Sequence, residues 1–307
     1  MLVSVVIPTY QREDQLVNTI SYVLSNTYPT FEVIVVDQTE QHTPMVAEAL
    51  ALFRQNTKFQ HLQIPIANLP LARNVGLRRS KGDIIIYIDD DVELGEDFIE
   101  AHAKCYEDPR IGAVGGRIIN LHGQASDPTG NAKPGQILSD GTRTTHFYKT
   151  QRARIDWGMG CNMSFRRTAL EEINGFDERY SGAAKHEDID VFVRVRQAGY
   201  TAIFEPAASL IHLKAVGGGC RAQGEDLRRA RSYLRSEIFF FMVSGRGFLS
   251  TIKRGIQGSL FHADQLMKSN PGLGTAKLAI TCKLFGSIGE ALIDRVFRSS
   301  NYLSRKL

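Results

Sequence analysis

Three consecutive carboxylates, Asp89, Asp90 and Asp91, directly follow the apolar run 84–88, where a buried strand is expected to end. Side chains on a strand alternate between its faces, so Asp89 and Asp91 can point the same way. Neighbouring carboxylates repel each other, and a cation between them relieves the repulsion. A hard divalent ion, Mn²⁺ or Mg²⁺, suits such a site, especially one that also holds a diphosphate. The alternative is a helix start, capped by Asp91 and running to about Tyr106.

The composition is that of a soluble globular protein, with 43% apolar and 23% charged residues among 307. Four widely spaced cysteines form no C-x-x-C pair, which favours a reducing compartment and argues against structural zinc. The chain opens in the short apolar run 2–7 without a basic lead, so no secretion signal is expected. No uncharged apolar stretch reaches about 18 residues, so no spanning helix is expected. These features predict a cytoplasmic location.

Apolar periodicity predicts alternating strands and helices in the first half of the chain. Strands are expected at 3–7, 33–36, 62–66 and 84–88, and helices at 13–25, 44–54 and 70–80. This alternation favours an α/β fold with an open, mostly parallel sheet and helices on both faces. Ligands of such sheets lie beyond the carboxyl ends of the strands, where Pro8-Thr9, Asp37 and the acidic triplet all fall.

The second half is less regular. Strands are expected at 113–119, 161–166, 201–204 and 209–213, and helices at 168–173 and 187–198. Residues 120–154 show no period and are interpreted as a mobile flap or a plain surface insertion. Gly217-Gly218-Gly219 indicates a flexible joint. We therefore place a boundary near residue 220, between a catalytic domain, 1–220, and a helical C-terminal extension, 221–307.

Six ordered motifs carry a family resemblance. They are Val5-Val6-Ile7-Pro8-Thr9-Tyr10, Val35-Val36-Asp37, Leu71-Ala72-Arg73-Asn74-Val75-Gly76, Ile88-Asp89-Asp90-Asp91, Asn174-Gly175-Phe176-Asp177-Glu178 and His186-Glu187-Asp188. In this order and spacing, over roughly residues 1–215, the chain closely resembles family 2 glycosyltransferases of the GT-A fold. The resemblance implies inverting transfer of a sugar from a nucleotide-diphosphate donor to a hydroxyl of a glycan or lipid-linked glycan, in cell-surface or exopolysaccharide synthesis.

The resemblance also implies roles at the metal and at the reacting hydroxyl. Asp91 would ligate Mn²⁺ or Mg²⁺ bridging the two phosphates, with Asp89 nearer the ribose or beside the metal. His212 stands about where many relatives supply a metal ligand, although a histidine among apolar residues is also commonly structural. Asp188 matches the base that takes the acceptor proton, and Glu187 would orient acceptor hydroxyls. Both acids could instead cap a helix.

Further positions match the donor side of the family's site. Pro8-Thr9 and Asp37 match residues that hold the base and ribose, and Asp37 could alternatively cap the next turn. Arg73 and Asn74 match a nucleotide-side motif in which a guanidinium suits phosphate oxygens, although Arg73 could pair with an acid on its own helix. Trp157 is expected either to stack on a sugar or to be plain core.

The last part of the chain is basic. Residues 1–220 carry 22 Lys and Arg against 27 Asp and Glu, whereas residues 221–307 carry 15 against 6. Arginines share a helix with Leu234, Ile238 and the cluster Phe239-Phe240-Phe241-Met242. One hypothesis is peripheral attachment to the anionic inner face of the plasma membrane. The alternative is that the apolar face packs on the catalytic domain or on a second subunit. No nucleic-acid-binding motif accompanies the charge, and the oligomeric state is left open.

Two other functions compete with transfer. A nicotinamide-dependent enzyme is disfavoured, because residues 8–12 after the first strand lack G-x-G-x-x-G. A non-catalytic carbohydrate- or nucleotide-sugar-binding protein on the same fold is the second alternative. The joint presence of Asp91, Asp188 and His212 argues against it, because a scaffold needs no base opposite a metal site.

Overall fold

A computed structural model describes residues 1–120, 132–139, 141–182, 184–215, 217–219 and 227–243. A single open sheet of nine strands forms its centre, in the order β3-β2-β1-β4-β8-β6-β9-β5, with β7 paired to β9. The strands are β1 (Val3–Thr9), β2 (Phe31–Asp37), β3 (Phe59–Gln63), β4 (Ile84–Ile88), β5 (Val92–Leu94), β6 (Ile111–Asn120), β7 (Ala153–Arg154), β8 (Asn162–Arg166) and β9 (Thr201–His212).

The pairing confirms the expected α/β fold with a mostly parallel sheet. Strands β3, β2, β1 and β4 are parallel neighbours, and β6 pairs in parallel with β9. Strand β8 lies antiparallel between β4 and β6, and β5 and β7 are antiparallel to β9. The β1 and β4 side chains are all buried, as expected for strands covered on both faces.

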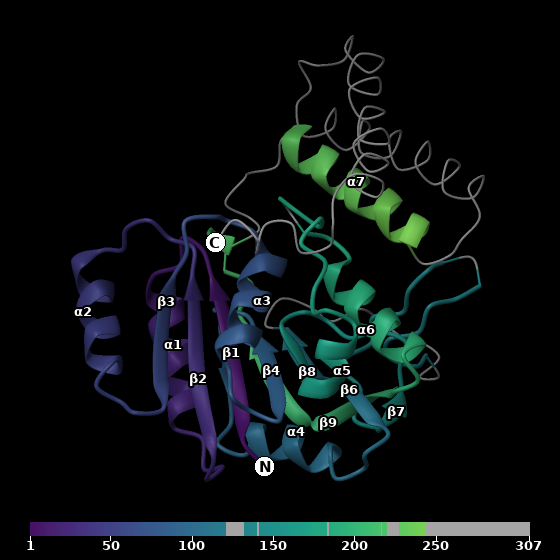
Figure 1. Cartoon of the computed structure of the whole chain (residues 1–307), viewed down its shortest axis with the longest axis horizontal. Helices are drawn as coiled ribbons and strands as arrows, with labels where there is room; N and C mark the ends of the chain where they lie inside the picture. Colours follow the sequence, from purple (N-terminus) through teal and green to yellow (C-terminus); the bar gives the residue numbers. More distant parts are fainter. Residues whose placement is uncertain (121–131, 140, 183, 216, 220–226, 244–307) are drawn as a thin grey trace.

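Helices cover both faces of this sheet (Figure 1). They are α1 (Asp14–Leu24), α2 (Pro44–Phe53), α3 (Leu69–Arg79), α4 (Phe98–Cys105), α5 (Arg167–Glu172), α6 (Glu187–Gln197) and α7 (Leu227–Val243). Strand alternation assigns α4 and α6 to opposite faces. Ser164 of β8 contacts His102 of α4, with 2.8 Å between Oγ and Nδ1, while the next residue, Phe165, packs its ring 5.0 Å from that of Phe192 on α6.

Several predicted boundaries differ from the structure. The third strand is Phe59–Gln63 and not 62–66, because its register is set by pairing with β2. The two strands expected at 201–204 and 209–213 are one strand, β9, in which a register shift absorbs the polar interruption. Asp91 caps no helix: the short strand β5 follows it, and α4 begins only at Phe98.

The expected flap is only partly described. Residues 121–131 and 140 lie outside the described residues. The remainder is tied to the domain: the Ile118 amide of β6 donates to the Phe147 carbonyl at 2.9 Å, and β7 pairs with β9. This part of 120–154 is therefore anchored chain, and the flap hypothesis stays a prediction for residues 121–131.

The glycine triplet 217–219 contacts the exit of β1. The Gly219 amide donates a hydrogen bond to the Tyr10 carbonyl, with 2.6 Å between N and O. Gly218 has φ +74, and a Cβ there would lie 2.3 Å from the Gln11 carbonyl oxygen, so only glycine fits this approach. Gly218 and Gly219 therefore lie against the chain that follows β1, and the flexible joint expected here stays a prediction. The proposed boundary near 220 falls among residues 220–226, outside the described part.

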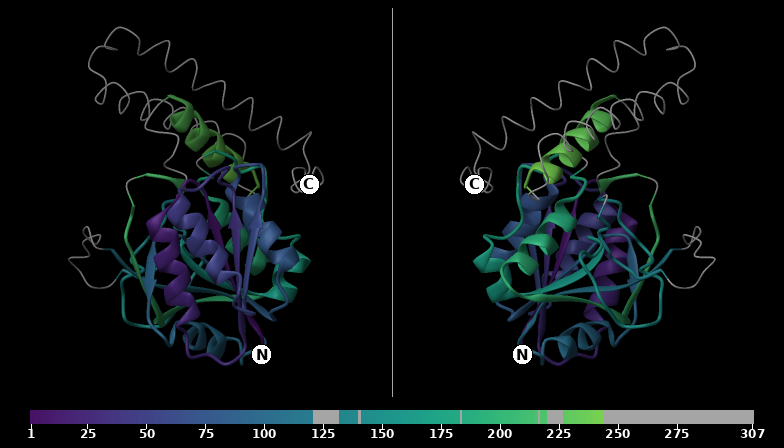
Figure 2. Two further views of the ribbon diagram at one scale, coloured as in Figure 1. Left: turned by 90° about the vertical axis from the view of Figure 1, so that its left-hand side faces the viewer. Right: turned by 90° about the vertical axis from the view of Figure 1, so that its right-hand side faces the viewer.

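Helix α7 lies across the end of the domain at which β1 ends, opposite the N-terminus (Figure 2). Its side chains Leu234, Ile238, Phe239 and Phe240 are all buried. The Phe239 ring packs edge-on against Tyr180, at 5.0 Å between centroids. Phe240 also packs against His186, at 5.6 Å between ring centroids, which supports the alternative that this face packs on the protein; membrane attachment of the basic tail stays a prediction. In the described part of the chain, no helix is both long and apolar enough to cross a membrane.

Candidate active site

A crevice lies at the carboxyl ends of the central strands, beyond β1, β2 and β4. The residues that line it are Pro8, Thr9, Tyr10, Arg12, Gln38, Ala67, Asn68, Leu69, Asp89, Asp90, Asp91, Gly182, His212, Gly219 and Tyr233. The sequence analysis places Pro8, Thr9 and the acidic triplet at this edge, and the structure brings them together. We call this crevice the triplet pocket.

Asp89, Asp91 and His212 form a cluster in which three potential metal-ligand atoms lie within 4.8 Å of one another. His212 Nε2 lies 3.2 Å from Asp91 Oδ1 and 3.7 Å from Asp89 Oδ2. Pairing of β5 with β9 sets this geometry, because Val92 is opposite His212. Burial raises the pKa of Asp91, but the hydrogen bond with His212 and the charge of Arg12 outweigh it, so the net pKa is lowered. Asp91 is thus held as a carboxylate.

Asp90 has a different environment. It points toward β1, where the Thr9 hydroxyl donates to its Oδ2 at 2.7 Å and Arg12 Nε lies 3.3 Å from Oδ1. Burial raises its pKa to about 7, although the charge of Arg12 opposes this shift. The Asp90 backbone carbonyl accepts from the Thr19 hydroxyl at 3.1 Å. Asp90 therefore fixes the turn after β4, while Asp89 and Asp91 are the carboxylates that lie close to His212.

A second pocket adjoins the first and shares Leu69, Asp89, His212 and Tyr233 with it. Its other residues are Arg73, Arg143, Thr145, Trp157, Met159, Gly160, Cys161, Ala184, Lys185, His186, Glu187, Asp188 and Ile189. Because it holds the proposed base, we call it the base pocket. The two pockets meet at Asp89 and His212, so the metal-ligand cluster and Asp188 belong to one continuous site.

Asp188 lies at the start of α6 and is positioned by backbone amides. Its Oδ2 accepts from the Gly160 N–H at 3.1 Å, and its Oδ1 accepts from the Ile189 N–H at 2.9 Å. Burial raises its pKa, while the charge of Arg73 and these amides act in the opposite direction. A carboxylate with a raised pKa is a better proton acceptor near neutral pH than a free aspartate.

Glu187 is buried against Arg73, which itself is 1% exposed. Arg73 also donates from Nη2 to the Gly160 carbonyl at 3.1 Å and lies 3.9 Å from Asp89 Oδ1. Burial raises the pKa of Glu187 to about 7, against the charge of Arg73. The structure thus directs Arg73 to Glu187, and not to an acid on its own helix. Phosphate contact by Arg73 stays a prediction.

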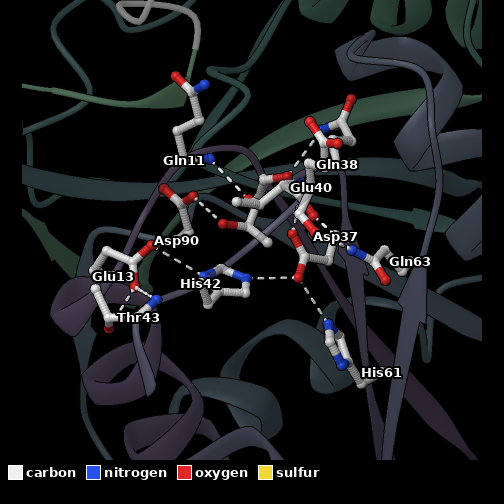
Figure 3. A network of polar contacts seen from close by, with 12 residues as sticks. Gln11, Glu13, Asp37, Gln38, Glu40, His42, Thr43, His61, Gln63 and Asp90 are labelled. Atoms are coloured by element: carbon white, nitrogen blue, oxygen red, sulfur yellow. Dashed lines mark hydrogen bonds and ion pairs between the residues drawn. The ribbon is translucent and has the colours of Figure 1, made fainter. Parts of the chain in front are cut away.

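Asp37 lies at the end of β2 but does not line either pocket. Figure 3 shows His42 and His61 both pointing at its Oδ2, at 2.7 and 2.8 Å from their Nε2 atoms. Its Oδ1 accepts from the Thr39 N–H at 2.8 Å, the turn-capping contact named as the alternative. Burial raises the pKa of Asp37, but these hydrogen bonds outweigh it and the net pKa is lowered. The neighbouring Gln38 lines the triplet pocket instead.

Asn74 is a structural residue here. Its Nδ2 donates to the Phe176 carbonyl at 2.9 Å and to Glu178 Oε1 at 2.8 Å, and its Oδ1 accepts from the Phe176 N–H at 2.8 Å. It lines neither pocket. The nucleotide contact expected of Asn74 is therefore not supported by its position. The side chain instead ties α3 to the turn 174–178.

Trp157 is a core residue that also borders the base pocket, and its stacking on a sugar stays a prediction. It is 5% exposed and packs edge-on against Phe147, at 5.1 Å between ring centroids, as a core residue does. It also forms part of the wall of the base pocket. The indole therefore shapes that pocket from within the core.

Several residues of the site were not predicted from the sequence, among them Arg12, Asn68, Arg143, Lys185 and Tyr233. Arg12 comes shortly after the end of β1. A basic residue at a strand end that also carries site residues could have been identified from the sequence as a candidate site residue. Tyr233 belongs to α7 and is brought to both pockets only by tertiary packing, which no local pattern reports.

Comparison with known proteins agrees with this geometry. The sequence model of "Glycosyl transferase family 2" matches residues 4–174, and that of the "N-terminal domain of galactosyltransferase" matches residues 145–215. The first match covers more than half of the chain and includes the acidic triplet. The chain belongs to glycosyl transferase family 2.

Two curated relatives are similar over most of the chain. An uncharacterised protein of Sinorhizobium fredii, y4gI, is 26% identical over 77% of this chain, which spans only 27% of that protein's length. The amylovoran biosynthesis glycosyltransferase AmsB of Erwinia amylovora is 25% identical over 75% of this chain and 76% of its own.

Two solved structures share the fold at low sequence identity. Residues 1–349 of S. aureus TarS, in complex with UDP-GlcNAc, match with a TM-score of 0.63 at 14% identity, covering 95% of this chain and 81% of that one. The mannosyltransferase PcManGT of Pyrobaculum calidifontis, in complex with GDP-Man and Mn²⁺, matches with a TM-score of 0.54 at 16% identity, covering 96% and 87%. These likenesses confirm the GT-A fold.

Proposed function

We propose that the chain is an inverting glycosyltransferase that moves a sugar from a nucleotide-diphosphate sugar to a hydroxyl of a glycan or lipid-linked glycan. The observation that carries this proposal is that Asp89 and His212 of the acidic cluster line the same pocket as the partly buried carboxylate Asp188. Relatives that act in polysaccharide synthesis, such as AmsB, support an exopolysaccharide or cell-surface product.

The donor nucleotide fits the triplet pocket. Its walls come from the ends of β1 and β4 and offer Gln38, Asn68 and Arg12 as polar contacts. Pro8 and Thr9 form its floor at the end of β1, where Thr9 is fixed by its hydrogen bond to Asp90. Asp37 would act indirectly. Its hydrogen bonds with Thr39 and His42 hold the turn after β2, and that turn places Gln38 in the wall of the triplet pocket.

The cluster Asp89, Asp91 and His212 fits a divalent cation. Two carboxylates and an imidazole form a donor set that suits Mn²⁺, because a nitrogen ligand favours a transition metal over Mg²⁺. When bound, the ion would neutralise charge on the departing nucleoside diphosphate. Asp91 is suited to bind a cation, because its lowered pKa keeps its carboxylate ionised.

Asp188 would accept the proton of the acceptor hydroxyl. A single positioned carboxylate is enough for direct displacement with inversion, because the incoming hydroxyl and the departing diphosphate lie on opposite sides of the anomeric carbon. The hydrogen bonds from Gly160 and Ile189 fix the carboxylate in place. Glu187, locked to Arg73, would orient acceptor hydroxyls and support the start of α6.

A panel of UDP-, GDP- and dTDP-sugars with Mn²⁺ and with Mg²⁺ tests the proposal. A ligand that binds only the folded protein raises its melting temperature. We expect one nucleotide class to raise it only when metal is present, and Asp91→Asn to abolish that rise. Metal-dependent turnover of the same donor separates a transferase from the second candidate, a non-catalytic nucleotide-sugar-binding protein. Binding without turnover across a broad acceptor panel would favour the binding protein.

A cytoplasmic location at the inner face of the plasma membrane belongs to this proposal, because lipid-linked acceptors are held there. The buried side of α7 leaves residues 244–307 as the candidates for attachment, and they lie outside the described residues. Removal of those residues would release the protein from acidic vesicles if they attach it.

A further inference from the structure

Two cationic side chains line the base pocket together with Asp188. Arg143 comes from the segment before β7, and Lys185 comes from the residues just before α6. Neither residue lines the triplet pocket, where the donor diphosphate is expected. These charges therefore face the part of the site in which an acceptor would lie.

Glu237 of α7 holds both cations loosely. Its Oε1 lies 4.0 Å from Arg143 Nη2, and its Oε2 lies 3.9 Å from Lys185 Nζ. These separations allow attraction between charges but exceed the length of a hydrogen bond. The side chains of Arg143, Lys185 and Glu237 are 18%, 35% and 18% exposed, so water is largely but not wholly excluded. Glu237 therefore makes no close ion pair with either cation.

The surroundings of the pair support a bound anion. Burial lowers the pKa of Lys185 against the charge of Glu237, which shows the cost of holding this cation away from water. His186, beside it, is 4% exposed, and its Nε2 has no hydrogen-bond partner among the described residues. The Tyr233 ring lies 5.4 Å from Lys185 Nζ and lines both pockets, as an aromatic surface for a sugar would.

We propose that Arg143 and Lys185 form an anion-binding subsite that recognises a carboxylate or phosphate on the saccharide acceptor. This proposal rests on the proposed function and names the class of acceptor. A guanidinium and an ammonium in a partly dry pocket give strong charge-assisted hydrogen bonds to an oxyanion. A neutral acceptor would gain nothing from them. The contribution of Glu237 is to keep the two cations in place until the acceptor arrives.

Isothermal titration of sugars into the full chain tests the proposal, with the triplet pocket filled by Mn²⁺ and whichever of UDP, GDP and dTDP raises the melting temperature. The probes are methyl glucuronide, glucose 6-phosphate and the neutral methyl glucoside. We expect at least one anionic sugar to bind on the order of tenfold more tightly than methyl glucoside. Preference for the glucuronide indicates a uronic acid acceptor, and preference for the phosphate indicates a phosphorylated one.

Substitutions test whether the preference for anionic sugars comes from Arg143 and Lys185. Arg143→Gln and Lys185→Gln should each weaken the anionic sugar by about tenfold and leave methyl glucoside unchanged. Glu237→Gln should have the opposite effect and raise the affinity for the anionic sugar, because the carboxylate that competes for the two cations is removed. Arg110→Gln is the matched control, since that arginine is 80% exposed and outside the pocket.

The proposal is overturned if neither anionic sugar binds at millimolar concentration, or if both pair variants bind it as the wild type does. The readout does not need turnover. Selective anion binding by a chain that transfers no sugar would therefore refute the proposed function and keep the subsite. Transfer to an anionic acceptor at the wild-type rate in both variants would refute the subsite and keep the proposed function.

Discussion

Arg73 and Glu187 form an ion pair that lies wholly inside the protein, between α3 and the start of α6. The same guanidinium holds the Gly160 carbonyl at 3.1 Å, and the Gly160 amide in turn donates to Asp188. Arg73 therefore connects the acidic side of the site to the proposed base through one loop residue. Charge in the interior is stable only when paired, so each member depends on the other.

The first prediction concerns this pair. Arg73→Met leaves the Glu187 carboxylate buried without its cation, and we expect a loss of about 3–5 kcal/mol in the free energy of unfolding at pH 8. The pKa of Glu187 is about 7 with its partner present, so the loss should shrink at pH 5, where the carboxyl is protonated. Urea unfolding measures both values. The double variant Arg73→Met, Glu187→Met should recover most of the loss, and equal losses at pH 5 and pH 8 would contradict the pairing.

The second prediction concerns Gly175. Its φ is +69, and a Cβ there would lie 2.5 Å from the Asn74 Oδ1 atom, which accepts from Phe176. Gly199 is the matched control, with φ +96 and no atom within 4 Å of an added Cβ. Gly199→Ala should cost roughly 1–2 kcal/mol for backbone strain alone. Gly175→Ala should cost at least about 1 kcal/mol more, because it also breaks the Asn74 contacts. Equal costs in thermal unfolding would show that the contact with Asn74 is unimportant.

The third prediction is a pH dependence from His102, which is fully buried between Ser164 and Asn162. Burial lowers its pKa to about 4, against the hydrogen bond to Asn162. The unfolded chain binds the proton near pH 6.5, so stability from neutral His102 is complete above that pH and is lost as pH falls toward 4. Between pH 7 and pH 4.5 this loss amounts to about 2–3 kcal/mol.

His102→Gln isolates that contribution, because glutamine does not titrate. The difference in unfolding free energy between wild type and His102→Gln should decrease by the same about 2–3 kcal/mol from pH 7 to pH 4.5. A difference that stays constant over this range would show that His102 does not titrate on unfolding.

Local pattern was enough to predict β1, β2 and β4, because each is a run of mostly apolar residues covered on both faces. Strand β3 is half-exposed and mostly polar, and its predicted bounds were three residues too late. Local pattern failed to predict strands that depend on pairing with a distant strand. Strand β5, for example, is only three residues long and forms because it pairs with β9. The family resemblance named Asp89, Asp91 and His212 as metal ligands, and the structure brings these three side chains together; their binding of a metal stays a prediction. The contacts of Asp37 with His61 and of Asn74 with Glu178 were not predicted, because these partners are distant in sequence.

The surface against which α7 packs could not be predicted from local sequence either, because it depends on tertiary contacts. Its apolar positions fit a membrane surface and a protein surface equally well in sequence, and burial of Phe239 against Tyr180 decides for the protein. The same packing brings Tyr233 to both pockets. Sequence alone gives the amphipathic pattern of a helix but not the surface that covers it.

The measurement that tests the central claim most directly is the rate of nucleoside diphosphate release from the donor found by the panel, compared between wild type and Asp188→Asn. If Asp188 is the base, the variant should lose about 10²–10⁴-fold in turnover while binding the metal–nucleotide complex with unchanged affinity. Full turnover by Asp188→Asn would contradict the assignment of the base and, with it, the enzymatic account of the pocket.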